Sequence, residues 1–287
     1  MPQDSSSDLS ITVGAIVVEE GGAMSADVVT TDYESFSSSL VILRNIEEQV
    51  VDAESEEFYG GSFWLLDLDR SANGSIFAGD ADGNVHTNAS GEWTVESVSP
   101  GFGIRVVRCL PDHTVFAAGS EGIVYVRTPD GWAAASANFG QWITGLDGRT
   151  ASDLVIAGDS GLVAQFDGTN WTRIELPTDV TFHAVLSFEN EYYVCGASGA
   201  LFSGSGLVWQ DRTSLRSDLH GITNYDGEIW LACGSDGAGR LGPNGLEIVL
   251  NTFAAYSVHS AGHYLGFAGN GSVVRFDGTN WHGRRYG

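Results

Sequence analysis

The sequence predicts an all-β protein, a β-propeller built from four-stranded blades, on the strength of three observations. A sequence unit recurs along the 287-residue chain at intervals of 35 to 40 residues. Within each unit, apolar and polar residues alternate with a period of two, which is the pattern of a half-buried strand. The chain also contains 38 glycines, which suit many tight turns between short strands.

The repeated unit reads as two apolar residues, Ala or Cys, and Gly, followed by a short glycine turn, an alternating strand and a turn that ends in Trp. Its first copy extends from Ile76 to Trp93. The first glycine recurs at Gly79, Gly119, Gly158, Gly196, Gly234 and Gly269. The Trp recurs at Trp93, Trp132, Trp171, Trp209 and Trp281, with Leu246 in its place in the fifth copy. Four-strand units of this length predict propeller blades, with the Trp in the core between blades.

The turns inside the unit carry their own signal. The string Phe-Asp-Gly-Thr-Asn-Trp occurs at residues 166 to 171 and again at 276 to 281. An Asp-Gly pair between alternating strands is typical of a two-residue type I′ hairpin. We therefore expect such a turn at Asp167 and Gly168.

The residues before the repeats do not show the unit, but they contain strand-like stretches at 9 to 18, 27 to 31, 39 to 43 and 49 to 51. Together these stretches would furnish one divergent blade. We therefore expect a single propeller over residues 9–287, with 9–61 as a divergent first blade or closing sheet, 62–287 as six recognisable repeats and 1–8 as a flexible start. Seven blades are favoured, and six blades with an appended sheet are the alternative.

The charge balance is strongly acidic. The chain has 37 acidic and 13 basic residues, a net charge of −24, and every basic residue is Arg. Such a surface repels phosphate backbones and anionic lipid, so we expect a basic protein partner rather than nucleic acid or membrane. Residues 1–61 hold half of the net charge. The candidate docking residues in this segment are Glu47, Glu48, Glu54, Glu56 and Glu57.

Composition also bears on compartment. No apolar run reaches the length of a membrane span, and the first residues lack the basic and apolar regions of a signal peptide. Three cysteines without CxxC spacing argue against a disulfide framework or a zinc site. We therefore expect a soluble, cytoplasmic protein, with a monomer favoured and Cys195 and Cys233 as small core residues.

One column of the aligned repeats gives candidate ligand-binding residues. It lies thirteen to fifteen residues before the first glycine, near the start of each innermost strand. In a propeller such positions form a ring around the channel, so polar side chains there can line its mouth. Two histidines on adjacent blades can hydrogen-bond a ligand, transfer a proton or bind a metal, or each can satisfy a local backbone group. The polar members of the column are Arg105, His183, His220 and Tyr256.

A second ring of candidates consists of acidic residues in the glycine turns. Carboxylates in such loops can hold Ca²⁺, but the EF-hand spacing is absent and solvated turn residues are the favoured interpretation. We therefore expect no cofactor and no metal. These residues are Asp80, Asp82, Glu121, Asp159 and Asp236.

The Gly-x-x-Gly-x-Val pattern followed by Asp-Gly-x-x-Trp resembles the BNR-like repeats and the photosystem II assembly factor group of propellers, over about residues 62–287. The resemblance implies a propeller and leaves the function open, because this fold hosts hydrolases, lectins and docking scaffolds. The arginine-rich patch associated with the assembly factors contrasts with this acidic chain. Gln165 and Arg275 replace the serine of the full sialidase Asp-box.

Three functional hypotheses follow. The favoured one is a non-catalytic interaction propeller whose acidic surface docks a basic partner, for instance as an immunity protein that inhibits a basic toxin. The second is a carbohydrate-binding or glycan-hydrolysing propeller that uses the channel mouth. The third is a structural subunit of a larger assembly.

Overall fold

The computed structural model describes residues 10–31, 36–44, 46 and 55–285. All of its long regular elements are strands, and a single 3-10 turn, η1 (Ala197–Gly199), interrupts them. Within these described ranges, no helix has the length and apolar character needed to cross a membrane.

The strands group into seven consecutive sets of four. The first four sets are β1 (Ser10–Val18), β2 (Met24–Thr31), β3 (Phe36–Leu43) and β4 (Ser55–Gly61); β5 (Leu65–Arg70), β6 (Ile76–Asp80), β7 (Asn84–Thr87) and β8 (Thr94–Ser97); β9 (Ile104–Cys109), β10 (Val115–Gly119), β11 (Val124–Thr128) and β12 (Gly131–Ala134); β13 (Ile143–Thr150), β14 (Asp153–Gly158), β15 (Val163–Phe166) and β16 (Trp171–Arg173). The last three are β17 (Phe182–Phe188), β18 (Glu191–Gly196), β19 (Leu201–Ser205) and β20 (Val208–Asp211); β21 (Gly221–Tyr225), β22 (Glu228–Ala232), β23 (Ala238–Gly242) and β24 (Gly245–Leu250); β25 (Ser257–Ala261), β26 (Tyr264–Gly269), β27 (Ser272–Phe276) and β28 (Trp281–Arg285).

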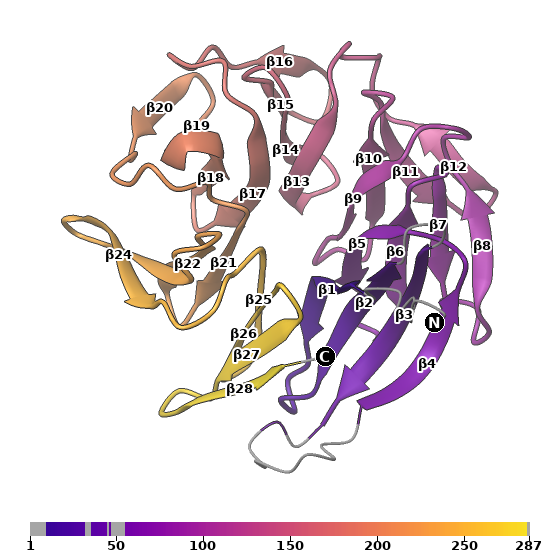
Figure 1. Ribbon diagram of the computed structural model, residues 1–287. Helices are drawn as coiled ribbons and strands as arrows, with labels where there is room; N and C mark the ends of the chain where they lie inside the picture. Colours follow the sequence, from indigo (N-terminus) through magenta and orange to yellow (C-terminus); the bar gives the residue numbers. More distant parts are fainter. Residues whose placement is uncertain (1–9, 32–35, 45, 47–54, 286–287) are drawn as a thin grey trace, which may run out of the picture.

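Each set forms one four-stranded antiparallel sheet, and the seven sheets form a closed ring (Figure 1). The innermost strands β1, β5, β9, β13, β17, β21 and β25 each contact the next, and β25 contacts β1. The protein is therefore a seven-bladed β-propeller. The prediction of seven blades is confirmed, and the alternative of six is wrong because β1–β4 complete the ring as a full blade.

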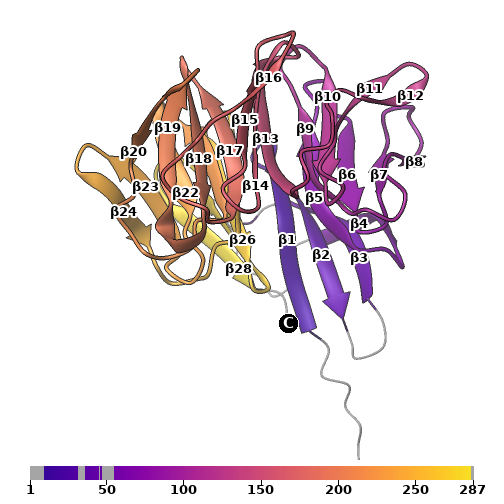
Figure 2. The same cartoon turned by 90° about the horizontal axis from the view of Figure 1, so that it is seen from above.

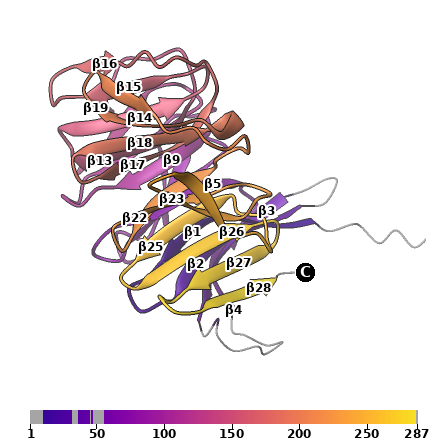
Figure 3. The ribbon, with the colours of Figure 1, turned by 90° about the vertical axis from the view of Figure 1, so that its left-hand side faces the viewer.

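Every blade is a contiguous stretch of chain, so the ring closes where the first blade meets the seventh (Figures 1 and 3). Across this seam the Ile16 N–H donates to Ser257 Oγ at 3.3 Å, and the Val18 N–H donates to His259 Nδ1 at 3.0 Å. Buried side chains of the first blade also pack with Ala268 of the seventh. Hydrogen bonds from backbone N–H groups to side chains, together with apolar packing, close the ring.

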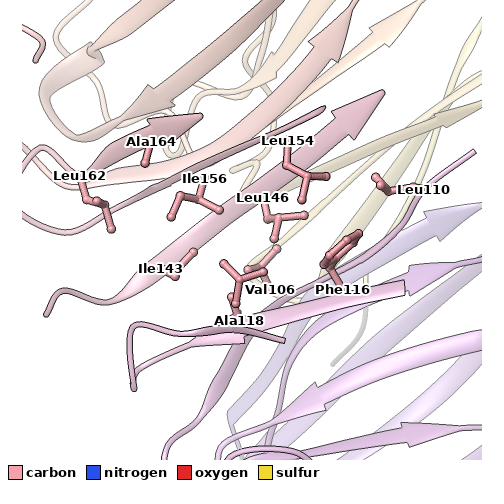
Figure 4. Packing of buried hydrophobic residues seen from close by; sticks show 11 residues of the cluster. Val106, Leu110, Phe116, Ala118, Ile143, Leu146, Leu154, Ile156, Leu162 and Ala164 are labelled. Carbon is pink, nitrogen blue, oxygen red and sulfur yellow. The ribbon is translucent and has the colours of Figure 1, made fainter. Parts of the chain in front are cut away.

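Neighbouring blades face each other across apolar clusters, as the repeat implies. Figure 4 shows one such cluster, in which Val106 and Phe116 of the third blade meet Leu146 and Ile156 of the fourth. The recurring Trp lies at the outer part of each cluster and is half-buried. Trp171, for example, packs against the third blade and donates its indole N–H to the Ala135 carbonyl at 3.2 Å. Leu246 takes the equivalent place between the fifth and sixth blades.

Cys195 and Cys233 share the cluster between the fifth and sixth blades, where both are buried and neither forms a disulfide. Burial raises the pKa of the Cys233 thiol to about 12. Both therefore behave as small core residues, as predicted.

The first glycine of the repeat has a steric role. At Gly158 a Cβ atom would overlap the carbonyl oxygen of Trp142, and at Gly119 it would overlap that of Gly103. In both cases the carbonyl belongs to the segment that leads into the innermost strand. Glycine is therefore required where the end of the second strand touches this segment.

The expected two-residue turn at Asp167 and Gly168 is wrong. Phe166 pairs with Trp171, so the loop contains four residues. The Asp167 carboxylate accepts hydrogen bonds from the N–H groups of Thr169 at 2.9 Å and Asn170 at 2.8 Å. This side-chain capping stabilises the longer loop, and the same contacts recur at Asp277.

The alternation of strand directions gives the ring two distinct faces (Figure 2). In every blade the first and third strands begin, and the second and fourth end, on the same side. We call this side the mouth face; it carries the connections between blades. The opposite side, which we call the hairpin face, carries the first-to-second and third-to-fourth strand turns.

Candidate functional site

The structure brings the four predicted ligand-binding residues together at the mouth of the channel. Arg105 lies on β9, His183 on β17 and His220 just before β21, and Tyr256 comes just before β25. All four line one cavity of about 320 Å³, whose lining also includes Thr144 and, at its deeper end, Asp67 and Arg108. The repeat register alone was therefore sufficient to find this set.

The two histidines stack on one another. Their ring centroids lie 5.1 Å apart with an angle of 13° between the planes, and Tyr256 meets the His220 ring edge-on at 4.8 Å. His183 Nδ1 donates to the Leu219 carbonyl at 3.0 Å, so Nε2 is the nitrogen left for a ligand. Burial lowers the pKa of His220, the neighbouring His183 lowers it further, and the Asp218 carboxylate opposes both. A neutral His220 ring is therefore favoured.

Arg105 is held in place from two sides. Its Nε donates to Ser120 Oγ at 3.0 Å, and its guanidinium lies 4.1 Å from the centroid of the Trp142 ring. Trp142 remains exposed beneath it. This pair is a cation–π contact on the mouth face.

Trp142 belongs to a larger feature, which we call the aromatic arc. Among the described residues, five exposed aromatic side chains are 39% to 47% accessible, and all five lie on the mouth face. Each begins a third strand or lies just ahead of an innermost strand. The members are Phe36, Trp64, Phe102, Trp142 and Tyr256.

Of these five aromatic residues, only Tyr256 was among the residues predicted from sequence. Trp64 and Trp142 each lie one residue before a member of the recognised column, Leu65 and Ile143. Phe102 lies two residues before its strand, so the aromatic residues do not align in a single column. The pattern that could have revealed the arc is an aromatic residue just before several of the innermost strands.

Deeper in the channel, polar side chains join adjacent blades. Three aspartates on innermost strands each accept a backbone N–H of the next blade: Asp67 from Val107 at 2.8 Å, Asp69 from Cys109 at 2.7 Å and Asp147 from Ser187 at 2.7 Å. Each donor lies 40 residues after its acceptor, which is one repeat. The equivalent positions of successive blades are therefore linked directly.

Arg108 lies between these carboxylates. Its nitrogens are 3.7 Å from Asp69 and 3.6 Å from Asp147, and its Nε donates to the Leu146 carbonyl at 3.1 Å. Burial raises the pKa of Asp67 to about 7, against the hydrogen bond from Val107 and the charge of Arg108. Burial also raises the pKa of Asp69 and Asp147. One guanidinium thus faces three carboxyl groups, of which Asp69 is buried and Asp67 and Asp147 are partly buried. We call Arg108 and these three aspartates the deep channel cluster.

Three of the five acidic turn residues, Asp80, Glu121 and Asp236, accept hydrogen bonds from nearby side chains. Asp80 is buried and accepts hydrogen bonds from Asn84 and from His86 Nε2 at 2.9 Å. Burial alone would raise the pKa of Asp80, but the hydrogen bonds from His86 and Asn84 lower it. Glu121 accepts the hydroxyls of Ser99 and Tyr125, and Asp236 that of Ser217. Asp82 and Asp159 also lie in these turns, and the described part of the chain holds no group of three potential metal ligands.

The structure separates the acidic N-terminal segment from the channel mouth. Glu56 and Glu57 lie on β4, the outermost strand of the first blade, near the end that begins at the hairpin face. Glu56 pairs with Arg44 at 2.8 Å on the surface. Glu47, Glu48 and Glu54 lie outside the described residues. The two predicted sites are therefore distinct.

No protein-family model matches the chain. Among curated proteins it is similar to the Immune protein Tsi7 of Pseudomonas aeruginosa, with 25% identity over 177 residues. The match covers 55% of this chain and 57% of that protein, so it spans little more than half of the relative's length.

The solved structures it resembles are propellers. The WD40 propeller domain of Doa1 superposes with a TM-score of 0.71 at 10% identity, covering 94% of this chain and 93% of that chain. A chain of the Mitotic Checkpoint Complex gives 0.67 at 11% identity, covering 100% and 94%. At this identity the likeness concerns the fold alone. It supports the expected propeller, while the likeness to BNR-like repeats stays a resemblance of sequence.

Proposed function

We propose that this chain is a non-catalytic, cytoplasmic propeller that binds and neutralises a basic effector protein, as an immunity protein does. The observation that carries the proposal is the aromatic arc around the channel mouth, taken with the similarity to an immunity protein. Exposed Trp and Tyr side chains are the residue types that dominate binding energy in protein interfaces. A monomeric chain rarely exposes several of them on one face without a partner.

Charge supports a basic partner. The net charge of −24 gives a long-range attraction for a cationic protein and speeds its association. The same charge opposes binding to nucleic acid. We expect the dissociation constant to rise with ionic strength, because exposed charges farther apart than about 10 Å are screened at ~0.1 M salt.

The proposal is tested by a growth assay in bacteria with two plasmids. Each gene adjoining that of this chain is expressed alone and together with the chain. We expect one product to arrest growth alone and to be tolerated when the chain is present. An unrelated propeller of similar net charge is the control, and it should not restore growth. If no adjoining product is both toxic and neutralised by the chain, the immunity function is wrong.

Carbohydrate binding at the channel mouth is the second candidate, because exposed Trp64, Trp142 and Tyr256 offer ring faces on which a sugar can stack. A glycan array would test it. Binding that is lost on His183→Ala and His220→Ala would support this function. An array without any signal would exclude it for the glycans displayed.

A further inference from the structure

We infer that the mouth face is the docking surface, and that it receives a protein surface presenting arginine or lysine side chains between the rings of the aromatic arc. The inference rests on the proposed function for the existence of a partner. It differs from the sequence-based hypothesis, which placed docking on the acidic segment around Glu56.

Exposed apolar side chains are distributed unequally between the two faces. Every large aromatic side chain that is exposed in the described residues lies on the mouth face. The exposed large aliphatic side chains instead lie on outer strands or on the hairpin face: Val95, Leu207, Val208 and Val249. A concentration of aromatic rings on one of two faces marks that face as the site of contact.

Acidic residues also lie in turns whose backbone contacts the segments that carry the rings. The Asp159 N–H donates to the Trp142 carbonyl at 3.0 Å, so these two residues are neighbours. The Ala81 N–H donates to the Trp64 carbonyl at 2.9 Å, which sets Trp64 next to exposed Asp82. The Asp82 carbonyl also accepts the N–H of Gly101 at 3.0 Å, adjacent to Phe102. Acidic turns therefore adjoin the segments that carry three of the five rings.

A ring face next to a carboxylate selects for a cation. The face attracts the charge through its quadrupole, and the carboxylate adds a direct ion pair. The protein already shows this chemistry within its own chain, because the Arg105 guanidinium lies 4.1 Å from the Trp142 ring centroid. Among the described residues no cation lies over Trp64 or Phe102, although the Phe36 ring packs beside Trp64 with 5.7 Å between the centroids. A cation from a partner would take the ring surface that remains exposed.

The acidic edge of the first blade lacks these features. Glu56 is already paired with Arg44, and exposed ion pairs of this kind contribute about 0–1 kcal/mol. No exposed aromatic ring lies on the described part of β4. Charge alone at this edge gives attraction at long range, whereas the mouth face offers both attraction and contact area.

The test uses full-length protein, a synthetic arginine-rich peptide and a glutamate-rich peptide of the same length, measured by isothermal titration calorimetry. We expect the arginine-rich peptide to bind and the double substitution Trp64→Ala with Trp142→Ala to weaken it about tenfold or more. The matched control Leu207→Ala with Val208→Ala, on the hairpin face, should bind as the wild type does. Glu56→Gln with Glu57→Gln should change the affinity less than about threefold.

A second variant controls for the possibility that the Trp-to-Ala substitutions disrupt folding. Trp64→Phe with Trp142→Phe keeps the ring faces, so it should retain most of the affinity, and its far-ultraviolet circular dichroism should match the wild type. Unchanged affinity in the Trp-to-Ala variant would overturn the inference. So would a larger loss at Glu56 and Glu57, preferential binding of the glutamate-rich peptide, or binding of chitohexaose at the mouth face with no peptide response.

The two experiments can fail independently, so the docking surface and the immunity function are tested separately. If the peptide binds through the mouth face but no adjoining gene product is neutralised, the docking surface stands and the immunity function fails. If an effector is neutralised equally well by the Trp-to-Ala variant, the immunity function stands and the docking surface is wrong.

Discussion

The two halves of the channel use the same innermost strands for different purposes. At the mouth, Arg105 and His220 present nitrogen atoms to an open cavity. A few residues further along these strands, Asp67 and Asp147 hold the next blade by its backbone, with Arg108 between them. The difference shows that a polar residue near the axis of a propeller is not by itself a sign of binding. Polar side chains on these strands are available to a ligand only through atoms that no neighbouring blade has already bound, such as Nε2 of His183.

The largest loss of stability is expected when Arg108 of the deep channel cluster is substituted. Arg108→Met leaves the three carboxyl groups of the deep channel cluster without their counter-charge, and we expect the free energy of unfolding at pH 8 to fall by about 3 kcal/mol. Urea denaturation measures the change. Arg173→Met is the matched control, because Arg173 lies on the surface at 3.8 Å from exposed Glu175. Equal losses in the two variants would show that the deep channel cluster does not hold the blades together.

The next effect concerns pH. Burial raises the pKa of Asp67 from 3.8 to about 7, so between these values the folded state keeps a proton that the unfolded state has released. The retained proton contributes fully to the free energy of unfolding below pH 4, and this contribution is lost as the pH rises through 7. The free energy of unfolding falls by no more than about 1.4 kcal/mol per pH unit in this range. Asp67→Asn should therefore flatten the decline in stability between pH 5 and pH 8.

The Asn side chain can still accept the Val107 N–H through its oxygen. We expect the variant to gain stability relative to wild type at pH 8 and to show a smaller gain at pH 5, as measured by urea denaturation at both values. A constant difference across this range would mean that Asp67 is ionised throughout.

The smallest effect on stability is expected at the mouth. Arg105→Ala with His220→Ala should change the free energy of unfolding by less than about 0.5 kcal/mol for each substitution, because neither side chain joins two blades by a hydrogen bond. Thermal unfolding of the double variant measures this directly. A loss as large as that expected for Arg108→Met would remove the distinction between the two halves.

The fold was predictable from sequence in part because four blades repeat one steric requirement, at Gly119, Gly158, Gly196 and Gly269. A glycine such as Gly158 must meet the carbonyl of the segment entering the innermost strand, and the repeat preserves it. The Arg105 and His220 ring followed from that register. The deep channel cluster did not, since 37 acidic residues gave no reason to select Asp67 over any other. The aromatic arc was missed because its members occupy different positions in segments of unequal length.

The closing seam has a mechanical consequence. Six of the seven interfaces between blades are crossed by a connecting segment of chain, but the described strands of the first and seventh blades meet without one. This interface is therefore held only by noncovalent contacts, namely the hydrogen bonds to His259 and Ser257 and the packing beside Ala268. Burial lowers the pKa of His259 to about 4, so acid removes the Nδ1 acceptor of Val18 only below this value. Under tension the ring should open at this interface while the other six interfaces between blades stay intact, which makes this seam the first point of mechanical failure.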